Sequence, residues 1–337
     1  RQRQMCIRDS PYQLPNSTAH NETCANIGNL LFNWRMFQTS GNARYVDIVE
    51  NCLYNSILSG ISLDGKRYFY TNPLRISADL PYTLRWPKQR TEYISCFCCP
   101  PNTLRTLCEV QNYVYTLSDE GVWCNLYGGS ELDTEWMGNH IQLLQETDYP
   151  WDGAVSITLK EVPEKKPLSL FLRVPEWCTK ATLAVNDVPV TTDLKAGTYA
   201  EIKRIWKKGD RVAFVMGMEP VLLESHPLVE ETRNQVAVKR GPVVYCLESM
   251  DVEAGKRIDD ILIPADIKFS PVKTEIAGSR VTVLDGIAHS VDSDSWEGKL
   301  YRKVAENGDR IPIRLIPYYA WGNRGESEMT VWMLLER

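Results

Sequence analysis

The spacing of apolar residues changes once along this chain, near residue 120, and that change constrains the fold more than any other feature. In residues 22–38 and 43–58, apolar side chains recur three and four residues apart, which predicts two helices. The Ser-Gly-Asn at 40–42 has turn chemistry, so we expect the pair to form a helical hairpin. Residues 102–115 predict a third helix, preceded by Pro101 at a position where helix starts accept proline.

The chain beyond residue 120 has the two-residue period of strands. Its runs are short and alternating or apolar, and Gly, Pro, Asp and Lys separate them, which predicts antiparallel β-sandwiches. A stretch rich in proline and charge, 219–233, divides the runs into two β regions. Since three helices cannot bury their own apolar stripes, we expect the helical part to be the end of a larger helical domain. The predicted class is α+β and multidomain.

Length and charge narrow the classes of partner. The 337 residues are enough for two or three domains with proper cores. Lys and Arg total 38 against 43 Asp and Glu, and the net charge of −5 is spread along the chain, which argues against nucleic acid or anionic lipid as a partner. No apolar run approaches the ~18 residues of a membrane helix. The compartment, cytoplasmic or periplasmic, stays open.

The first ten residues, RQRQMCIRDS, have no apolar period and no helix cap. They resemble a translated sequencing-adapter sequence, so we set them aside as non-native and expect the true protein to begin upstream. The sequence then predicts an adapter-like segment at 1–10, a helical part at 11–118, a β-sandwich at 119–220 and a second β region at 221–337.

The segment SCFCCPPNTL at 95–104 concentrates cysteine just before a predicted helix. Cys98 and Cys99 cannot bridge to each other without strain. The dipole and free N–H groups of a helix N-terminus stabilise negative charge and favour a lowered thiol pKa. Thiolates in that position are suited to metal binding and to nucleophilic attack. The alternative is that these cysteines are small buried hydrophobic residues.

Further ligands for a metal would have to come from a distant part of the chain, and Glu22 and Cys24 are the best candidates. The turn-like segment before them would allow both side chains to converge at the mouth of a helix. Together with Cys98 and Cys99 they would form a four-coordinate zinc site of thiolates and one carboxylate. The spacing lacks the paired Cys-x-x-Cys of structural zinc modules, so the residues alone leave the zinc site and the buried-cysteine alternative open.

A set of motifs in fixed order extends this interpretation. They are ETCA at 22–25, NCLYN at 51–55, YFYTNPL at 68–74, CCPPN at 98–102, QETDYPWDG at 145–153, LRVPEWC at 172–178 and KRGPVVYCLE at 239–248. Together they resemble glycoside hydrolase family 127, whose members include β-L-arabinofuranosidases. The resemblance implies the C-terminal part of an (α/α)6 barrel followed by antiparallel β-sandwich domains. It also implies a retaining glycosidase that uses a cysteine thiolate as its nucleophile.

The resemblance assigns roles to individual residues. It implies Zn²⁺ as the cofactor, with ligands at Glu22, Cys24 and Cys99, and Cys98 as a ligand that is also the nucleophile. A glycan with terminal β-L-arabinofuranosyl groups is the implied substrate. Two alternatives are a structural zinc site in a carbohydrate-binding β-sandwich module, and a related hydrolase for another L-sugar of pectin. A homodimer through the β-sandwich domains is a further expectation.

For the residues of the sugar pocket and the general acid/base, the resemblance implies roles that compete with other interpretations. Glu50 and Tyr70 would line the sugar pocket; the alternatives are a solvated helix carboxylate for Glu50 and a packed aromatic with a backbone partner for Tyr70. The general acid/base would be a glutamate shortly before Tyr12, but residues 1–10 contain none, so we expect the chain alone to be inactive. Cys96 would either compete for zinc or pack as a small hydrophobe, and packing is favoured.

Overall fold

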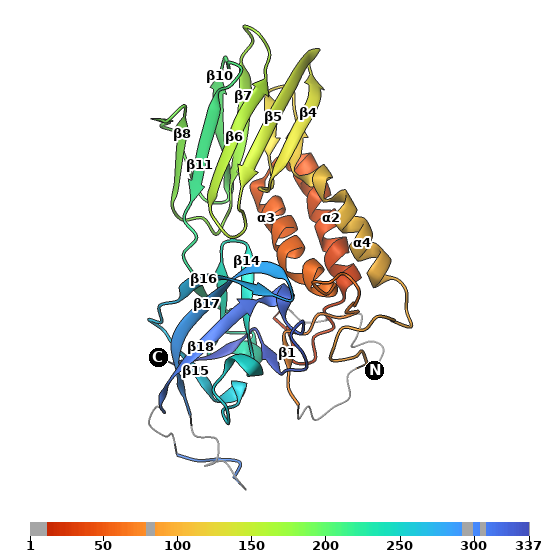
Figure 1. Ribbon diagram of the computed structural model, residues 1–337, viewed down its shortest axis with the longest axis vertical. Coiled ribbons are helices and arrows are strands. Elements are labelled where there is room, and N and C mark those ends of the chain that lie inside the picture. Colours follow the sequence, from red (N-terminus) through yellow and green to blue (C-terminus); the bar gives the residue numbers. More distant parts are fainter. Residues whose placement is uncertain (1–11, 79–84, 292–298, 304–307, 337) are drawn as a thin grey trace. The chain divides into compact units, whose positions relative to one another are not determined.

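The computed structural model describes residues 12–78, 85–291, 299–303 and 308–336 (Figure 1). The chain divides into two compact units. Unit 1 comprises Arg1–Asn26, Asn55–Thr103 and Pro220–Arg337, and unit 2 comprises Ile27–Tyr54 and Leu104–Glu219. Among the described residues, no helix combines the length and the apolar character that crossing a membrane requires.

The predicted helices form with shifted ends. They are α2 (Thr23–Ser40), α3 (Ala43–Asn51) and α4 (Cys99–Glu109). Asn42 caps α3 by accepting a hydrogen bond from the Arg44 N–H, and beyond Asn51 the chain continues as a π-helix, Cys52–Ile57. Helix α4 starts at Cys99, so Pro101 lies within its first turn. In the described part of the chain, the 3-10 helices are Leu58–Gly60, Val110–Tyr113, Glu230–Thr232, Ser249–Asp251, Ile258–Asp260 and Tyr318–Ala320.

Unit 2 contains a β-sandwich. One sheet has the order β10 (Thr198–Arg204), β7 (Leu168–Val174), β3 (Gly121–Cys124), β2 (Tyr115–Leu117). The other has the order β4 (Ser130–Trp136), β5 (Asn139–Thr147), β6 (Ala154–Glu161), β11 (Arg211–Met216), β8 (Ala181–Val185), β9 (Val188–Pro189) (Figure 1). Leu170 and Leu172 of β7 and Ile157 of β6 belong to one buried core, which lies between the two sheets.

Strand β7 is buried on both faces, unlike a strand at the surface of an isolated sandwich. Its other face carries Phe171, which stacks on Trp123 of β3 with ring centroids 4.1 Å apart. Phe37 of α2 packs against the Trp123 and Tyr199 rings. The helical segment of unit 2 therefore buries its apolar stripe against a sheet.

Unit 1 contains a mixed ten-stranded sheet. Its order is β1 (Arg75–Ile76), β19 (Met329–Thr330), β14 (Val243–Glu248), β18 (Arg310–Pro317), β17 (Ser279–Ser290), β15 (Ile261–Pro264), β20 (Met333–Glu336), β13 (Gln235–Arg240), β12 (Val221–Glu224), with β16 (Ser270–Ile276) paired to β17. Most pairs are antiparallel, but β15 and β20 are parallel, as are β3 and β7 in unit 2.

The predicted fold class is wrong in its central element. The described residues contain three α-helices and no (α/α)6 barrel, and the sheets are not purely antiparallel. The prediction assumed that the helices needed further helices to cover their apolar stripes. In the structure a sheet provides that cover, through Phe171 and Trp123.

Candidate functional site

The start of α2 is fixed by pairing with the segment around Tyr70, within unit 1. Glu22 and Thr71 form an antiparallel bridge, and the Thr23 N–H donates to the Tyr70 carbonyl at 3.0 Å. The buried Thr23 hydroxyl lies 3.2 Å from the Phe69 and Tyr70 carbonyls. These bonds hold Glu22 beside Tyr70 at the N-terminus of the helix.

The start of α4 positions the two adjacent cysteines. The Thr103 hydroxyl donates to the Cys99 carbonyl at 3.0 Å, and the Asn102 N–H donates to the Cys98 carbonyl at 3.3 Å. The Asn102 side-chain amide donates to Cys24 Sγ at 3.1 Å and so joins this helix start to that of α2. Glu22, Cys24, Cys98 and Cys99 will be called the thiol cluster.

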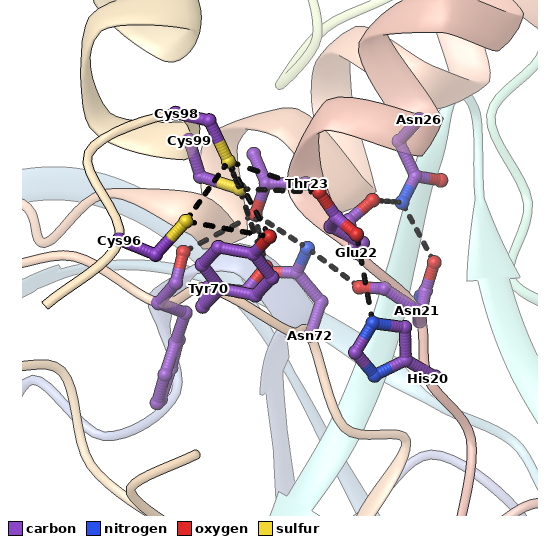
Figure 2. A network of polar contacts seen from close by, with 11 residues as sticks. His20, Asn21, Glu22, Thr23, Asn26, Tyr70, Asn72, Cys96, Cys98 and Cys99 are labelled. Carbon is purple, nitrogen blue, oxygen red and sulfur yellow. Dashed lines mark hydrogen bonds and ion pairs between the residues drawn. The ribbon is translucent and has the colours of Figure 1, made fainter. Parts of the chain in front are cut away.

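The structure brings the four residues of the thiol cluster together. Figure 2 shows three of them, Glu22, Cys98 and Cys99. One ligand atom from each lies within 4.8 Å of every other. The Cys98 and Cys99 sulfurs are 3.7 Å apart, and each is 3.9 Å from Glu22 Oε1. Tetrahedral zinc with bonds of about 2.3 Å to sulfur and 2.0–2.2 Å to oxygen would set S···S near ~3.8 Å and S···O near ~3.6 Å. The donor set and its spacing therefore fit zinc.

Burial changes one prediction about the thiols. Burial is the largest effect on the Cys99 thiol and raises its pKa, and hydrogen bonding with Cys24 adds to this. The sequence argument expected the helix N-terminus to lower the thiol pKa. For Cys99 desolvation outweighs that effect, so a cation would be needed to hold this sulfur as thiolate.

Tyr70 contacts the thiol cluster through Cys98. The Cys98 thiol donates to its hydroxyl oxygen at 3.4 Å, and the hydrogen bond between these two side chains is the main cause of a raised Tyr70 pKa. The Tyr70 ring stacks on Trp86, with centroids 3.8 Å apart and planes at 18°. The alternative of a hydroxyl bound to a backbone group is wrong, because the partner is the proposed nucleophile itself.

Cys96 and His20 border the same cluster. Cys96 is exposed, so the favoured prediction that it packs as a small hydrophobe is wrong; its sulfur lies 4.0 Å from that of Cys98. His20 Nε2 lies 3.5 Å from Glu22 Oε2, opposite the thiols (Figure 2). Sequence reasoning missed His20, Trp86 and Asn102. The i, i+2 spacing of His20 and Glu22 in an extended segment was the available signal, because such residues share a face.

The structure places Glu50 in unit 2, in what will be called the arginine network: Asp47, Glu50 and Arg173. Glu50 is 1% exposed, so the alternative of a solvated helix carboxylate is wrong. Its carboxylate accepts hydrogen bonds from Arg173, from the Tyr149 hydroxyl at 2.6 Å and from the Trp177 indole at 3.2 Å. Nothing in the sequence pointed to these contacts beyond the motifs that contain the residues.

Arg173 also binds Asp47, and the two carboxylates share one buried guanidinium. Burial raises the pKa of Asp47, although the charge of Arg173 acts in the opposite direction. The expected position of a general acid/base, before Tyr12, lies outside the described residues.

Comparison with known families covers most of the chain. The profile described as the GH127 catalytic domain of β-L-arabinofuranosidase matches residues 9–112. The GH127 middle domain matches 121–218, and the family 127 C-terminal domain matches 220–334.

Individual relatives agree with these matches. A non-reducing end β-L-arabinofuranosidase of Bifidobacterium longum subsp. longum is 30% identical over 334 residues, which is 95% of this chain and 50% of that protein. A GH127 β-L-arabinofuranosidase of Geobacillus stearothermophilus T6 has a TM-score of 0.90 at 36% identity, covering 96% of this chain and 51% of that one. A glycoside hydrolase structure has a TM-score of 0.95 at 67% identity, with coverage of 97% and 54%. The chain thus spans about half the length of these relatives, and it belongs to glycoside hydrolase family 127.

Proposed function

We propose that this chain carries the nucleophile and the metal ligands of a retaining β-L-arabinofuranosidase that acts on glycans. The observation that supports this most directly is the thiol cluster with the Tyr70 hydroxyl on Cys98. The names of the relatives support β-L-arabinofuranose as the sugar that is released. Since the chain spans half of their length, the activity is proposed for the whole protein.

Glu22, Cys24, Cys98 and Cys99 would hold the cofactor, Zn²⁺, which when bound keeps coordinating thiols deprotonated at neutral pH. Cys98 Sγ attacks the anomeric carbon, the C–S bond forms, and the bond from that carbon to the leaving oxygen breaks. The leaving oxygen takes a proton from the general acid. Water then attacks the same carbon and gives a proton to the group that acted as the acid, the C–S bond breaks, and Cys98 is released as the thiolate. The Tyr70 hydroxyl orients that sulfur throughout.

A catalytic site is favoured over a structural zinc site by exposure. Glu22, Cys24 and Cys98 are partly exposed, and only Cys99 of the four is buried. A closed structural site normally buries its ligands, whereas a nucleophile must be reached by substrate. A sugar contact of Glu50, and a homodimer through the β units, stay predictions; sedimentation velocity would measure the second.

Covalent labelling tests the proposal without depending on the general acid. A 2,4-dinitrophenyl 2-deoxy-2-fluoro-β-L-arabinofuranoside has a leaving group that departs unprotonated, and the fluorine slows release of the sugar from sulfur. We expect mass spectrometry of the zinc-loaded chain to find one fluoroarabinosyl group on Cys98. Cys98→Ser should abolish the adduct, and the exposed neighbour variant Cys96→Ser should retain it.

Absence of an adduct on Cys98 in folded, zinc-loaded protein would overturn the proposal and favour the structural site. The same experiment compares substrates. Dinitrophenyl glycosides of other L-sugars of pectin should label Cys98 more slowly; faster labelling by one of them would replace arabinofuranose as the proposed sugar.

A further inference from the structure

Asn72 lies two residues after Tyr70 in unit 1, and it is 0% exposed (Figure 2). Its backbone N–H donates to the Asn21 carbonyl at 2.8 Å. Its side-chain Nδ2 donates to the same carbonyl at 3.3 Å and to Thr23 Oγ1 at 3.1 Å. Asn21 and Thr23 are the neighbours of Glu22 in the chain, so one buried side chain binds on both sides of a proposed metal ligand.

The oxygen of the Asn72 amide is anchored in the interior of the same unit. It accepts a hydrogen bond from the Ser59 hydroxyl at 2.7 Å, and Ser59 is also 0% exposed. The Ser59 carbonyl in turn accepts from Nε of Arg90 at 3.0 Å. Arg90 is buried and donates to the carbonyls of Tyr319, at 3.0 Å, and Trp321. The Asn72 amide therefore cannot turn or withdraw without leaving buried polar groups unpaired, which is costly.

The partners of Asn72 connect it to the thiol cluster. The hydroxyl of Thr23, which receives the Asn72 amide, also lies 3.2 Å from the Tyr70 carbonyl. The Cys98 sulfur lies 3.4 Å from the Tyr70 hydroxyl and 3.9 Å from Glu22 Oε1. Both distances depend on how the segments that carry Tyr70 and Glu22 lie against each other. A shift of ~1 Å between such segments is enough to disturb a reactive geometry.

We propose that Asn72 is a positioning residue for the thiol cluster. Its side chain fixes the segments of Glu22 and Tyr70 to each other, and so sets the distances of the Glu22 carboxylate and the Tyr70 hydroxyl from Cys98 Sγ. Asn72 acts through these neighbours and not on the sugar. This role rests on the proposed function, which takes Glu22 as a metal ligand and Cys98 as the nucleophile.

Asn55 provides a matched control, because it joins chain segments of unit 1 in the same way. It is 6% exposed, its Nδ2 donates to the Pro242 carbonyl at 3.0 Å, and its Oδ1 accepts from the Val244 N–H at 2.8 Å. These partners belong to the turn before β14 and to that strand, not to the thiol cluster. Asn55→Leu and Asn72→Leu each remove one buried amide, so we expect both to lower the midpoint of urea unfolding.

Metal binding separates the two variants. We expect Asn72→Leu to weaken Zn²⁺ binding about tenfold, measured by competition with a chromophoric chelator, and to shift the sulfur-to-metal absorption of the Co²⁺-substituted chain. Asn55→Leu should bind Zn²⁺ like wild type and keep the Co²⁺ spectrum. Ser59→Ala, which removes only the hydrogen bond to Asn72 Oδ1, should lie between wild type and Asn72→Leu.

The labelling of Cys98 by the fluorinated arabinofuranoside distinguishes positioning from stability. In a series of probe concentrations, the rate constant at saturation should fall about tenfold in Asn72→Leu. The half-saturating concentration should stay within about twofold of wild type, because the partners of Asn72 are protein groups. A variant that is only less stable would instead give fewer labelled molecules with the wild-type rate constant.

Wild-type Zn²⁺ affinity and labelling rate constant in folded Asn72→Leu would overturn the positioning role, and so would equal losses in the two leucine variants. If Asn72→Leu does not fold, as judged by circular dichroism, Ser59→Ala against Asn55→Leu makes the same decision. Labelling of the wild-type chain with no effect of Asn72→Leu removes the positioning role alone. If the wild-type chain binds Zn²⁺ but is not labelled, the proposed function fails, and the Zn²⁺ affinities and Co²⁺ spectra still decide whether Asn72 positions the ligands.

Discussion

Glu22 and Glu50 each belong to a polar cluster, but the clusters balance their charge in different ways. In the arginine network the cation is part of the protein: the buried Arg173 side chain binds both Glu50 and Asp47. In the thiol cluster the groups around Glu22 Oε1 are sulfurs that become anionic when they bind metal. The first cluster receives its cation as the chain folds, and the second is arranged to receive one from solution. The two glutamates also differ in burial, since the Glu50 side chain is 2% exposed and that of Glu22 is 24% exposed.

The largest effect should come from removing the internal cation. Arg173→Met leaves Glu50 and Asp47 buried without a counter-charge, so we expect a loss of about 3–5 kcal/mol in the free energy of unfolding. Urea unfolding followed by tryptophan fluorescence measures it. The control is Arg314→Met, which breaks an exposed pair with Asp285 and should cost less than about 1 kcal/mol. Equal costs for the two variants would show that the buried cation of the arginine network does not stabilise the fold more than an exposed ion pair does.

A smaller effect should follow from removing the hydrogen bond to Cys24, a proposed metal ligand. Asn102→Asp keeps the shape of the side chain but replaces the N–H donor to Cys24 with an oxygen. Outer contacts of this kind change metal affinity about 10–100-fold, and we expect weaker Zn²⁺ binding in that range, measured by competition with a chromophoric chelator. The sulfur-to-metal absorption of the Co²⁺-substituted protein should shift as well.

The chain offers a matched control for this variant. Asn29 donates to the sulfur of Cys52 at 3.6 Å, the same chemistry at a cysteine outside the thiol cluster. Asn29→Asp should leave Zn²⁺ affinity and the Co²⁺ spectrum unchanged. If both variants weaken Zn²⁺ binding alike, the Asn102 amide has no special role at Cys24.

The smallest effects should be on the pH dependence of the free energy of unfolding, which two aspartates should change with opposite sign. Arg314 lowers the pKa of Asp285 from its ordinary 3.8, so that group stabilises the fold above pH 3.8 and the gain is lost as pH falls through the lowered pKa. Burial raises the pKa of Asp47, so its contribution is present below pH 3.8 and is lost as pH rises through the raised pKa. As pH rises from 3 to 7, Asp285→Asn should therefore lose stability relative to wild type and Asp47→Asn should gain. Slopes of the same sign would contradict the contrast between exposed and buried pairs.

The sequence predicted local features well where the cause was local. The apolar period located three helices and the change to strands, and the order of short motifs pointed to the family and to the residues of the thiol cluster. The barrel prediction was wrong because the partner of an apolar stripe is a non-local property; here that partner includes Phe171. The contacts of Glu50 could not be predicted from the sequence either, since Arg173 lies 123 residues away in the chain. The predicted domain limits stay a prediction.

The bridge between Glu22 and Thr71 has a consequence for the maturation of the protein. Glu22 and Cys98 are 76 residues apart, and it is the backbone pairing at Thr71 and Thr23, with the start of α4, that holds their side chains together. A cation that arrives after folding meets ligands that are already ordered, so its affinity is not reduced by the entropy of assembling them. Insertion of the proposed Zn²⁺ would then follow folding, and its extent would depend on the supply of the ion.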